Sequence, residues 1–368
     1  MAPSVDPAIV EALGLDPAST KIVSHGGSGF ASTFKLSSVV DGEEKNYFVK
    51  TGTGKDAEVM FRGDTSRTHN VSYVPNHELT YRTQGEHASL NAIHGVVPNF
   101  CPKSHAHGAM SSSPNKFFLA TDFLELGSSA PGGSGESLAT KLARLHTTPA
   151  PLPEGRDEPA FGFPVPTCCG ATEQDNSWRA SWPEFFADCR LRHILRQGRA
   201  SQGADGAAQL AEAVERTAAV VVPRLLGRVQ GVRPVVVHGD LWSGNHGRGR
   251  IAGRGGAEEV VFDPSCVYGH SEYELGIMRM FGGFGGGFWT EYLELVPKAE
   301  PRDEWEDRLE LYELWVFAFI YFVVFCSSRS IEIDCDSRYH QLNHWALFGS
   351  GYKNSAMSIM KRLIDKYG

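Results

Sequence analysis

The sequence of 368 residues contains no Cys-x-x-Cys pair, and of its seven cysteines only Cys168 and Cys169 are adjacent. This spacing matches no common metal-binding motif and no disulfide framework expected for a chain of this size. Residues 1–17 also lack a basic start followed by an apolar core, so no secretory signal is expected. These absences favour a reducing, cytoplasmic location.

Long hydrophobic runs and an excess of basic charge are also missing. The longest apolar stretch, Leu314 to Cys326, is well short of the roughly 20 residues that a membrane-spanning helix needs, and it predicts a buried helix instead. The net charge of −8 argues against nucleic acid or an anionic membrane as a partner. A chain of this length predicts about two subdomains.

Two short β-type runs each lead into side chains of the kind that handle phosphate. Val235–Val237 precede Asp240 and Asn245, and Val260–Phe262 precede Asp263. In ATP-dependent kinases a loop Asp accepts the proton of the attacking hydroxyl, an Asn five positions later holds Mg²⁺, and a second Asp holds the metal that bridges the phosphates. One Asp in a turn more commonly caps backbone N–H groups, but the combination is specific. We therefore predict a catalytic Asp240 and a Mg²⁺ site of Asn245 and Asp263 at adjacent strand ends.

A glycine-rich segment precedes this centre in the chain. Gly27, Ser28 and Gly29 match the first half of the phosphate-covering motif G-x-G-x-x-G, while Ser32 stands at the third glycine. Alone, the segment would be explained by a simple turn. Its position ahead of Lys50 favours a loop that covers the phosphates of ATP.

Lys50 ends a strand-like run, Asn46–Lys50, as does the kinase lysine that binds the α- and β-phosphates. Most lysines only cover surfaces, so a partner is needed to support this role. Glu86 lies in a helical-looking segment and is the candidate for an ion pair, with Glu78 as its rival. The stretch between them, Thr51 to Pro75, is expected to be a flexible loop or an insertion.

The apolar run Phe117–Leu124 predicts a buried strand that continues into an interlobe hinge. Adenine would bind there to the backbone of Asp122 and Leu124, although a plain core strand explains the composition equally well. The predicted division is an N-lobe of residues 1–124 and a C-lobe of residues 125–368.

The remaining chain predicts mainly helices. Helical segments are expected near residues 182–197 and 207–229, and the arginine- and glycine-rich residues 246–256 predict a hairpin tip. Ser271 and Glu274 form a capping-box pattern, which predicts a helix beginning there and a structural role for Glu274.

Several of these motifs resemble one family. Residues 238–245 (HGDLWSGN), 262–275 (FDPSCVYGHSEYEL) and 280–284 (MFGGF) are similar to the signature of the fructosamine-3-kinases, also called ketosamine-3-kinases. The resemblance implies an α+β, bilobal protein-kinase-like fold, with an antiparallel sheet plus helix in the N-lobe and a larger, mainly helical C-lobe. It also implies ATP- and Mg²⁺-dependent phosphorylation of the 3-hydroxyl of ketosamines, as small molecules or on glycated proteins. The 3-phosphate then makes the sugar–amine bond prone to break down, which removes the sugar.

The acceptor site is predicted from Trp242, whose ring would stack on the sugar, and from His344, which would bond sugar hydroxyls. For both residues a core packing role is an equal alternative before the resemblance is considered. Two other functions stay open: an aminoglycoside- or choline-type phosphotransferase with the same centre, and a pseudokinase-like interaction module. The joint presence of Lys50, Asp240, Asn245 and Asp263 disfavours the second.

Overall fold

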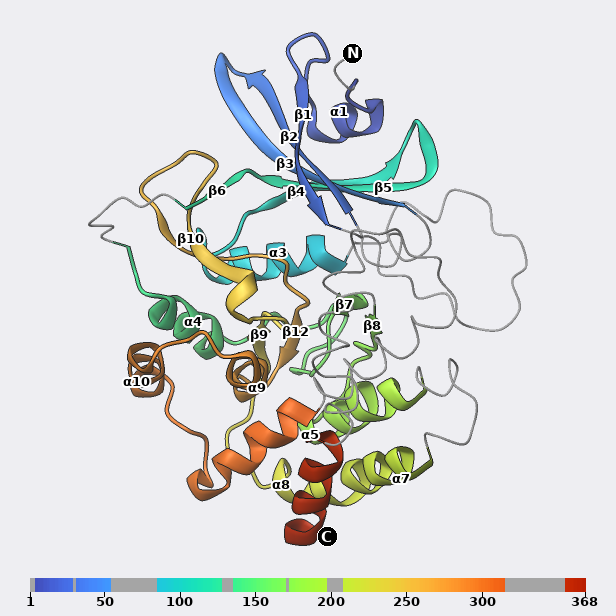
Figure 1. Cartoon of the computed structure of the whole chain (residues 1–368), viewed down its shortest axis with the longest axis vertical. Coiled ribbons are helices and arrows are strands. Elements are labelled where there is room, and N and C mark those ends of the chain that lie inside the picture. The colour runs from blue at the N-terminus through green and yellow to red at the C-terminus, as the bar shows by residue number, and fades with distance from the viewer. Residues whose placement is uncertain are drawn as a thin grey trace. The chain divides into compact units, whose positions relative to one another are not determined.

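The computed structural model describes residues 4–28, 31–53, 85–127, 135–169, 172–196, 208–314 and 355–368. The chain divides into two compact units that alternate along the sequence (Figure 1). The first unit comprises Met1–Lys141, Pro164–Glu173 and Gly244–Cys266, and the second comprises Leu142–Phe163, Gln174–Ser243 and Val267–Gly368.

The first unit contains a five-stranded antiparallel sheet in the order β1-β2-β3-β5-β4. Its strands are β1 (Lys21–Ser28), β2 (Ala31–Val40), β3 (Glu43–Thr53), β4 (Ser104–Met110) and β5 (Ser113–Asp122), and its helices include α1 (Pro7–Leu13) and α3 (Gly85–Val96) (Figure 1). The strands predicted around Lys50 and Phe117 are confirmed. The predicted loop after Lys50 was wrong at its start, because residues 51–53 continue β3; residues 54–84, with Glu78, lie outside the described part of the chain.

Short polar turns set the register of this sheet. Asp41 and Gly42 join β2 to β3 with φ of 55° and 80°, as a two-residue type I′ hairpin requires. The buried Asp6 carboxylate caps α1 through the Ala8 N–H and also accepts the N–H groups of Ser111 and Ser112 in the β4–β5 turn, all at 2.9 Å. Asp6 therefore fastens α1 to the sheet.

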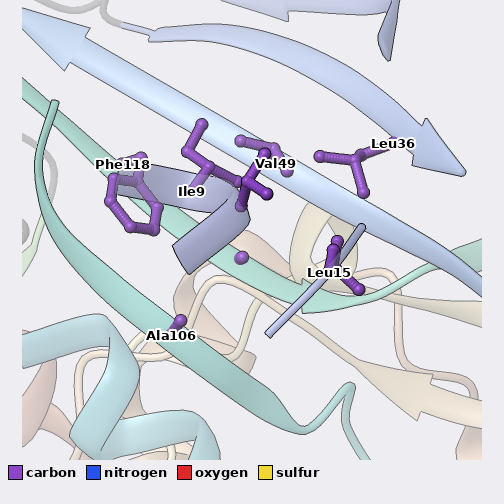
Figure 2. Packing of buried hydrophobic residues seen from close by; sticks show 8 residues of the cluster. Ile9, Leu15, Leu36, Val49, Ala106 and Phe118 are labelled. Atoms are coloured by element: carbon purple, nitrogen blue, oxygen red, sulfur yellow. The ribbon is translucent and has the colours of Figure 1, made fainter. Parts of the chain in front are cut away.

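The alternation of side chains along β3 separates a packing face from a polar face. Val49 is fully buried in a cluster with Ile9 of α1, Leu36 of β2 and Phe118 of β5 (Figure 2). Because successive strand residues point to opposite sides, Lys50 lies on the other face of the sheet. That face is the one that carries the candidate site.

A second sheet in the first unit has the order β11-β10-β6 and consists of β6 (Leu124–Leu126), β10 (His246–Ile251) and β11 (Glu258–Val261). β10 and β11 are antiparallel, so residues 246–256 do lie in a hairpin, but residues 246–251 form one of its strands and not its tip as predicted. β10 can approach β6 closely because residue 249 is glycine: a Cβ there would lie 2.8 Å from the Glu125 carbonyl oxygen.

The second unit is mainly helical. Its helices are α5 (Trp182–Phe185), η2 (Phe186–Arg192), α7 (Ala208–Arg216), η3 (Thr217–Val221), α8 (Val222–Leu225), α9 (Glu272–Phe281), α10 (Gly286–Leu295) and η5 (Arg302–Glu304) (Figure 1). Residues 305–314 and 355–367 are also helical, whereas α4 (Leu138–Thr147), β8 (Thr172–Gln174) and η4 (Ser243–Asn245) cross the boundary between the units, and β7 (Thr167–Cys169) belongs to the first. The helical segments predicted near residues 182–197 and 207–229 are confirmed.

An aromatic cluster forms the centre of the second unit. The buried Trp182 stacks on Phe185 with ring centroids 5.4 Å apart, and its indole N–H donates to the Tyr312 hydroxyl at 2.9 Å. That hydroxyl also lies 2.9 Å from Nδ1 of His270, so the polar atoms inside the cluster are paired. Within the described residues no helix is both long and apolar enough to cross a membrane. Of the stretch Leu314 to Cys326, only Leu314 is described, and it is buried and helical.

Two sequence predictions about these strands and helices were wrong. β9 (Val235–Val237) pairs with β12 (Val267–Gly269), whereas β11 pairs with β10, so the two Asp-bearing segments do not follow adjacent strands. Ser271 does precede α9, but it has helical backbone angles and its side chain makes no capping bond. The Glu274 side chain bonds elsewhere, and the predicted capping box is absent.

Candidate active site

Lys50 brings together two acidic side chains that are distant in the sequence. Its Nζ lies 3.1 Å from Oε2 of Glu86 on α3 and 3.4 Å from Oδ1 of Asp263, which follows β11. The Lys50–Glu86 ion pair expected from the sequence is present, and both side chains are 13% exposed. All three residues belong to the first unit.

The charge of Lys50 is stabilised by this arrangement. Burial alone would lower the pKa of the Lys50 ammonium, but the Glu86 and Asp263 carboxylates outweigh burial and hold that pKa above its ordinary value. A lysine fixed in its charged form can bind a phosphate group directly. The Asp263 side chain is 57% exposed, so its carboxylate can also reach a ligand.

Asp263 and Asn245 supply oxygen atoms suited to a hard cation. The Phe262 N–H donates to the Asn245 carbonyl oxygen at 3.1 Å, so Asn245 lies beside the residue that precedes Asp263. Carboxylate and amide oxygens are the ligands that Mg²⁺ prefers. Asp263 has a left-handed φ of 52°, a sparsely populated conformation for a non-glycine residue that clusters at functional sites. The residues present therefore fit a magnesium site.

A cavity of about 200 Å³ in the first unit adjoins this constellation. It is lined by His25, Phe48, Glu86, Leu90, Pro102, Leu119, Thr121, Asp122, Leu124, Leu126, Phe262 and Asp263. Phe48 pairs with Thr121, and Leu119 pairs with Lys50, so the sheet contributes the face opposite to the Val49 cluster. The predicted adenine residues Asp122 and Leu124 thus line the same cavity as Glu86 and Asp263.

The backbone of Asp122 is already partly engaged. Its N–H donates to the Lys103 carbonyl oxygen at 2.9 Å, and its side chain lies 2.8 Å from Nε2 of His105. Its carbonyl oxygen accepts the Thr121 hydroxyl at 3.0 Å but has a second lone pair. An adenine amino group would therefore meet the carbonyl oxygen of Asp122 rather than its N–H.

The described part of the glycine-rich segment, up to Ser28, ends β1, and β2 begins at Ala31. Gly27 pairs with Ser32 and Ser28 with Ala31, after a bulge in β1 where Gly26 has φ of 89°. Gly29 lies outside the described residues. The phosphate-covering role of this segment stays a prediction.

The loop that carries Asp240 belongs to the second unit, and the Glu274 side chain binds its backbone. The fully buried Glu274 carboxylate of α9 accepts the N–H of His238 at 2.5 Å and of Gly239 at 3.1 Å. The Asp240 N–H donates to Nδ1 of His238 at 3.3 Å. Sequence reasoning gave Glu274 a capping role and missed this contact; the only signal was a carboxylate inside the apolar face of a helix.

The predicted acceptor residues have different outcomes. Trp242 is 38% exposed and lies 5.7 Å from the Phe281 ring, so one aromatic surface follows Asp240 in the same unit. His344 lies outside the described residues.

Solved structures of sugar and drug kinases share this fold. A candidate fructosamine-3-kinase from Haemophilus somnus aligns over 98% of this chain and 96% of its own with a TM-score of 0.63 and 17% identity. A second candidate fructosamine-3-kinase, from Thermobifida fusca, aligns over 98% of this chain and 99% of its own with a TM-score of 0.61 and 20% identity. An aminoglycoside phosphotransferase aligns over 98% of both chains with a TM-score of 0.52 and 13% identity. The predicted α+β, protein-kinase-like fold is confirmed.

Sequence relatives narrow the family. A chloroplastic protein-ribulosamine 3-kinase from Arabidopsis thaliana is 31% identical over 77% of this chain and 71% of its own length. A candidate ketoamine kinase from Synechocystis is 31% identical over 89% of this chain and 85% of its own length. A mouse ketosamine-3-kinase is 36% identical over 55% of this chain and 53% of its own length. The fructosamine kinase family model matches residues 67–329, which is more than half of the sequence. On these matches, the chain belongs to the fructosamine kinase family.

Proposed function

We propose that this protein is an ATP- and Mg²⁺-dependent kinase that phosphorylates the 3-hydroxyl of ketosamines, meaning ribulosamine or fructosamine adducts on lysines or free amines. The observation that carries the proposal is the contact of Lys50 with both Glu86 and Asp263 beside a cavity that Asp122 and Leu124 also line. The match of the chain to the fructosamine kinase family supports ketosamines as the phosphate acceptors.

The nucleotide side of the mechanism is assigned to the first unit. Lys50 binds the α- and β-phosphates, and the segment Gly27, Ser28 and Gly29 covers them with backbone N–H groups. Asn245 and Asp263 would hold Mg²⁺, which would neutralise charge on the phosphate oxygens. Adenine occupies the cavity beside Asp122 and Leu124.

The acceptor side is assigned to the second unit. Asp240 accepts or orients the proton of the 3-hydroxyl while the hydroxyl oxygen attacks the γ-phosphorus. Glu274 and His238 support this role because they hold the backbone of the loop. Trp242 offers an exposed ring for stacking on the sugar, and His344 is assigned to its hydroxyl groups.

The expected consequence is deglycation, because a 3-phosphorylated ketosamine loses its amine spontaneously. Glycated proteins and free ketosamines are the proposed substrates, and a net charge of −8 favours neither nucleic acid nor an anionic membrane as a partner. The cytoplasm is the proposed compartment, since the five described cysteines are all free thiols.

The decisive experiment is an ATP-consumption assay with ribulose- and fructose-modified lysine, followed by mass spectrometry that locates the phosphate on the sugar. Choline and hygromycin B serve as competing acceptors. Phosphate on the 3-oxygen of a ketosamine supports the proposal. Turnover only on choline or the aminoglycoside, or ATP binding without turnover on any acceptor, contradicts it.

A further inference from the structure

The helix that carries Glu86 is joined to the segment that follows Asp263 at a second point. Ser89, one turn after Glu86 on α3, is fully buried. Its hydroxyl accepts the backbone N–H of Cys266 at 3.0 Å, and its carbonyl oxygen accepts the Cys266 thiol at 3.6 Å. Ser89 and Cys266 thus form a two-bond clamp between α3 and the loop after Asp263.

The segment held by this clamp follows a residue with an unfavourable backbone conformation. Asp263 has φ of 52°, a conformation that persists only where the flanking chain is fixed on both sides. On the N-terminal side, the Val261 N–H donates to the Phe100 carbonyl oxygen at 2.8 Å, and the Phe262 N–H is bonded as described above. On the C-terminal side the fixed residue is Cys266, whose carbonyl oxygen also accepts the Thr167 hydroxyl at 3.5 Å.

The contacts form a closed ring of short segments. Three residue steps lead from Glu86 to Ser89 along a helical turn, and three lead from Asp263 to Cys266. One end of the ring is closed by Lys50, which bridges the two carboxylates, and the other by the Ser89 hydroxyl. Glu86 and Asp263 carry like charges that repel one another, so their separation must be held by surrounding bonds.

We propose that Ser89 is a positioning residue for the magnesium–nucleotide site: its hydroxyl, by holding Cys266, fixes the Asp263 carboxylate relative to Glu86 and Lys50. The inference deepens the proposed function and rests on it. Loss of the hydroxyl leaves the Cys266 N–H buried without this acceptor, and the loop can then move to a commoner backbone conformation. Mutation of a residue that holds a metal ligand in place typically lowers metal affinity on the order of 10–100-fold.

The test compares Ser89→Ala with Ser104→Ala. Ser104 is the matched control because it is also a buried serine of the first unit bonded to α3, through Nδ1 of His87 at 2.9 Å, but it does not contact the segment after Asp263. Binding of a fluorescent ATP analogue to the full chain is titrated with and without Mg²⁺. Hydrogen exchange at the Cys266 amide and the unfolding midpoint are measured on the same samples.

In Ser89→Ala we expect Mg²⁺-dependent nucleotide binding to weaken on the order of tenfold or more, with faster exchange at Cys266. Ser104→Ala should keep wild-type binding even if its unfolding midpoint falls equally. Ser89→Cys preserves the packing but offers only a weak acceptor, so it should show the same weakening if the alanine variant does not fold.

Two outcomes overturn the inference in distinguishable ways. If the wild-type chain binds no Mg²⁺–nucleotide, the proposed function falls and the role of Ser89 falls with it. If the wild type binds but the Ser89 variants bind equally well, or no worse than Ser104→Ala, then Ser89 is a packing residue and only this inference is overturned.

Discussion

Lys50 is a buried charge, and two carboxylates offset the free energy lost when its ammonium leaves water. An ammonium removed from water is unfavourable unless it is paired, and here Glu86 and Asp263 both lie within 3.4 Å of Nζ. The two acids differ in exposure, at 13% for Glu86 and 57% for Asp263. Glu86 is therefore suited to orient the lysine, while the more exposed Asp263 carboxylate is the one proposed to bind Mg²⁺.

The role of Asp240 leads to a prediction about rate. Asp240→Asn removes the proton acceptor but keeps the shape of a half-buried side chain. We expect the turnover number kcat on a ketosamine to fall on the order of 10²–10⁴, the usual contribution of a positioned base, with nucleotide binding unchanged. Steady-state kinetics check this, with the exposed Asp303→Asn as a control. Undiminished turnover would remove Asp240 from the mechanism.

His270 predicts how stability depends on pH. Burial lowers the pKa of this histidine to about 4, while an unfolded chain has an ordinary histidine pKa of about 6.5. As pH falls from 6.5 to 4, the unfolded state therefore gains a proton that the folded state does not bind, and the free energy of unfolding decreases. The expected loss is on the order of 2–3 kcal/mol.

Urea unfolding between pH 7 and 4.5 measures this loss. In His270→Asn, which keeps an acceptor or donor near the Tyr312 hydroxyl, the decrease should be smaller than in the wild type, whatever the stability at pH 7. An equally steep decrease in both proteins would show that another group is responsible.

At the scale of elements, local sequence patterns predicted where a strand or helix forms better than they predicted which strands pair. The alternation in residues 46–50 correctly predicted β3, and motif spacing correctly predicted that Lys50 has an acidic partner on a helix. The run Val235–Val237, in contrast, is compatible with many strand partners, and its pairing with residues 267–269 depends on packing that no local pattern encodes. The two-residue turn at Asp41 and Gly42 has a signature of its own, whereas a buried bond such as Ser89 to Cys266 has none.

Helix α9 supports the catalytic loop through one carboxylate, which can be tested directly. In Glu274→Gln one of the two oxygens becomes an N–H donor; placed at Oε1 it opposes the Gly239 N–H, and placed at Oε2 it opposes the His238 N–H. We expect unfolding to become easier by about 1–3 kcal/mol and kcat to fall, because the loop with Asp240 shifts. Denaturant unfolding and kinetics measure both effects.

The exposed Glu294→Gln on α10 removes the same charge without a contact to the loop and is the control. A variant at Glu274 that loses stability but keeps the wild-type kcat would limit this residue to a purely structural role.

At the scale of the molecule, the chain alternates between its units. The first unit combines residues 1–141 with two later segments, and the catalytic loop leaves the second unit at Ser243 while Gly244 begins the last segment of the first. Asp240 and Asn245 are five positions apart and yet belong to different units. A single division placed at the end of the Phe117–Leu124 run cannot capture such alternation, because a local strand signal does not show which later segments return to the first unit; the lobe boundary there stays a prediction.

Ligand binding to the whole protein should raise its stability. If Asp263 and Asn245 hold Mg²⁺, ATP with Mg²⁺ at about 100 times its dissociation constant should stabilise the folded chain by about 2.7 kcal/mol, and removal of the metal by EDTA should cancel the metal-dependent part. Asp263→Asn is the suitable variant, because asparagine tolerates the left-handed φ of 52° while the negative charge is lost. Thermal unfolding with ATP, with and without Mg²⁺, measures the effect. An increase in the unfolding midpoint that is the same in the variant and the wild type would exclude Asp263 as a metal ligand.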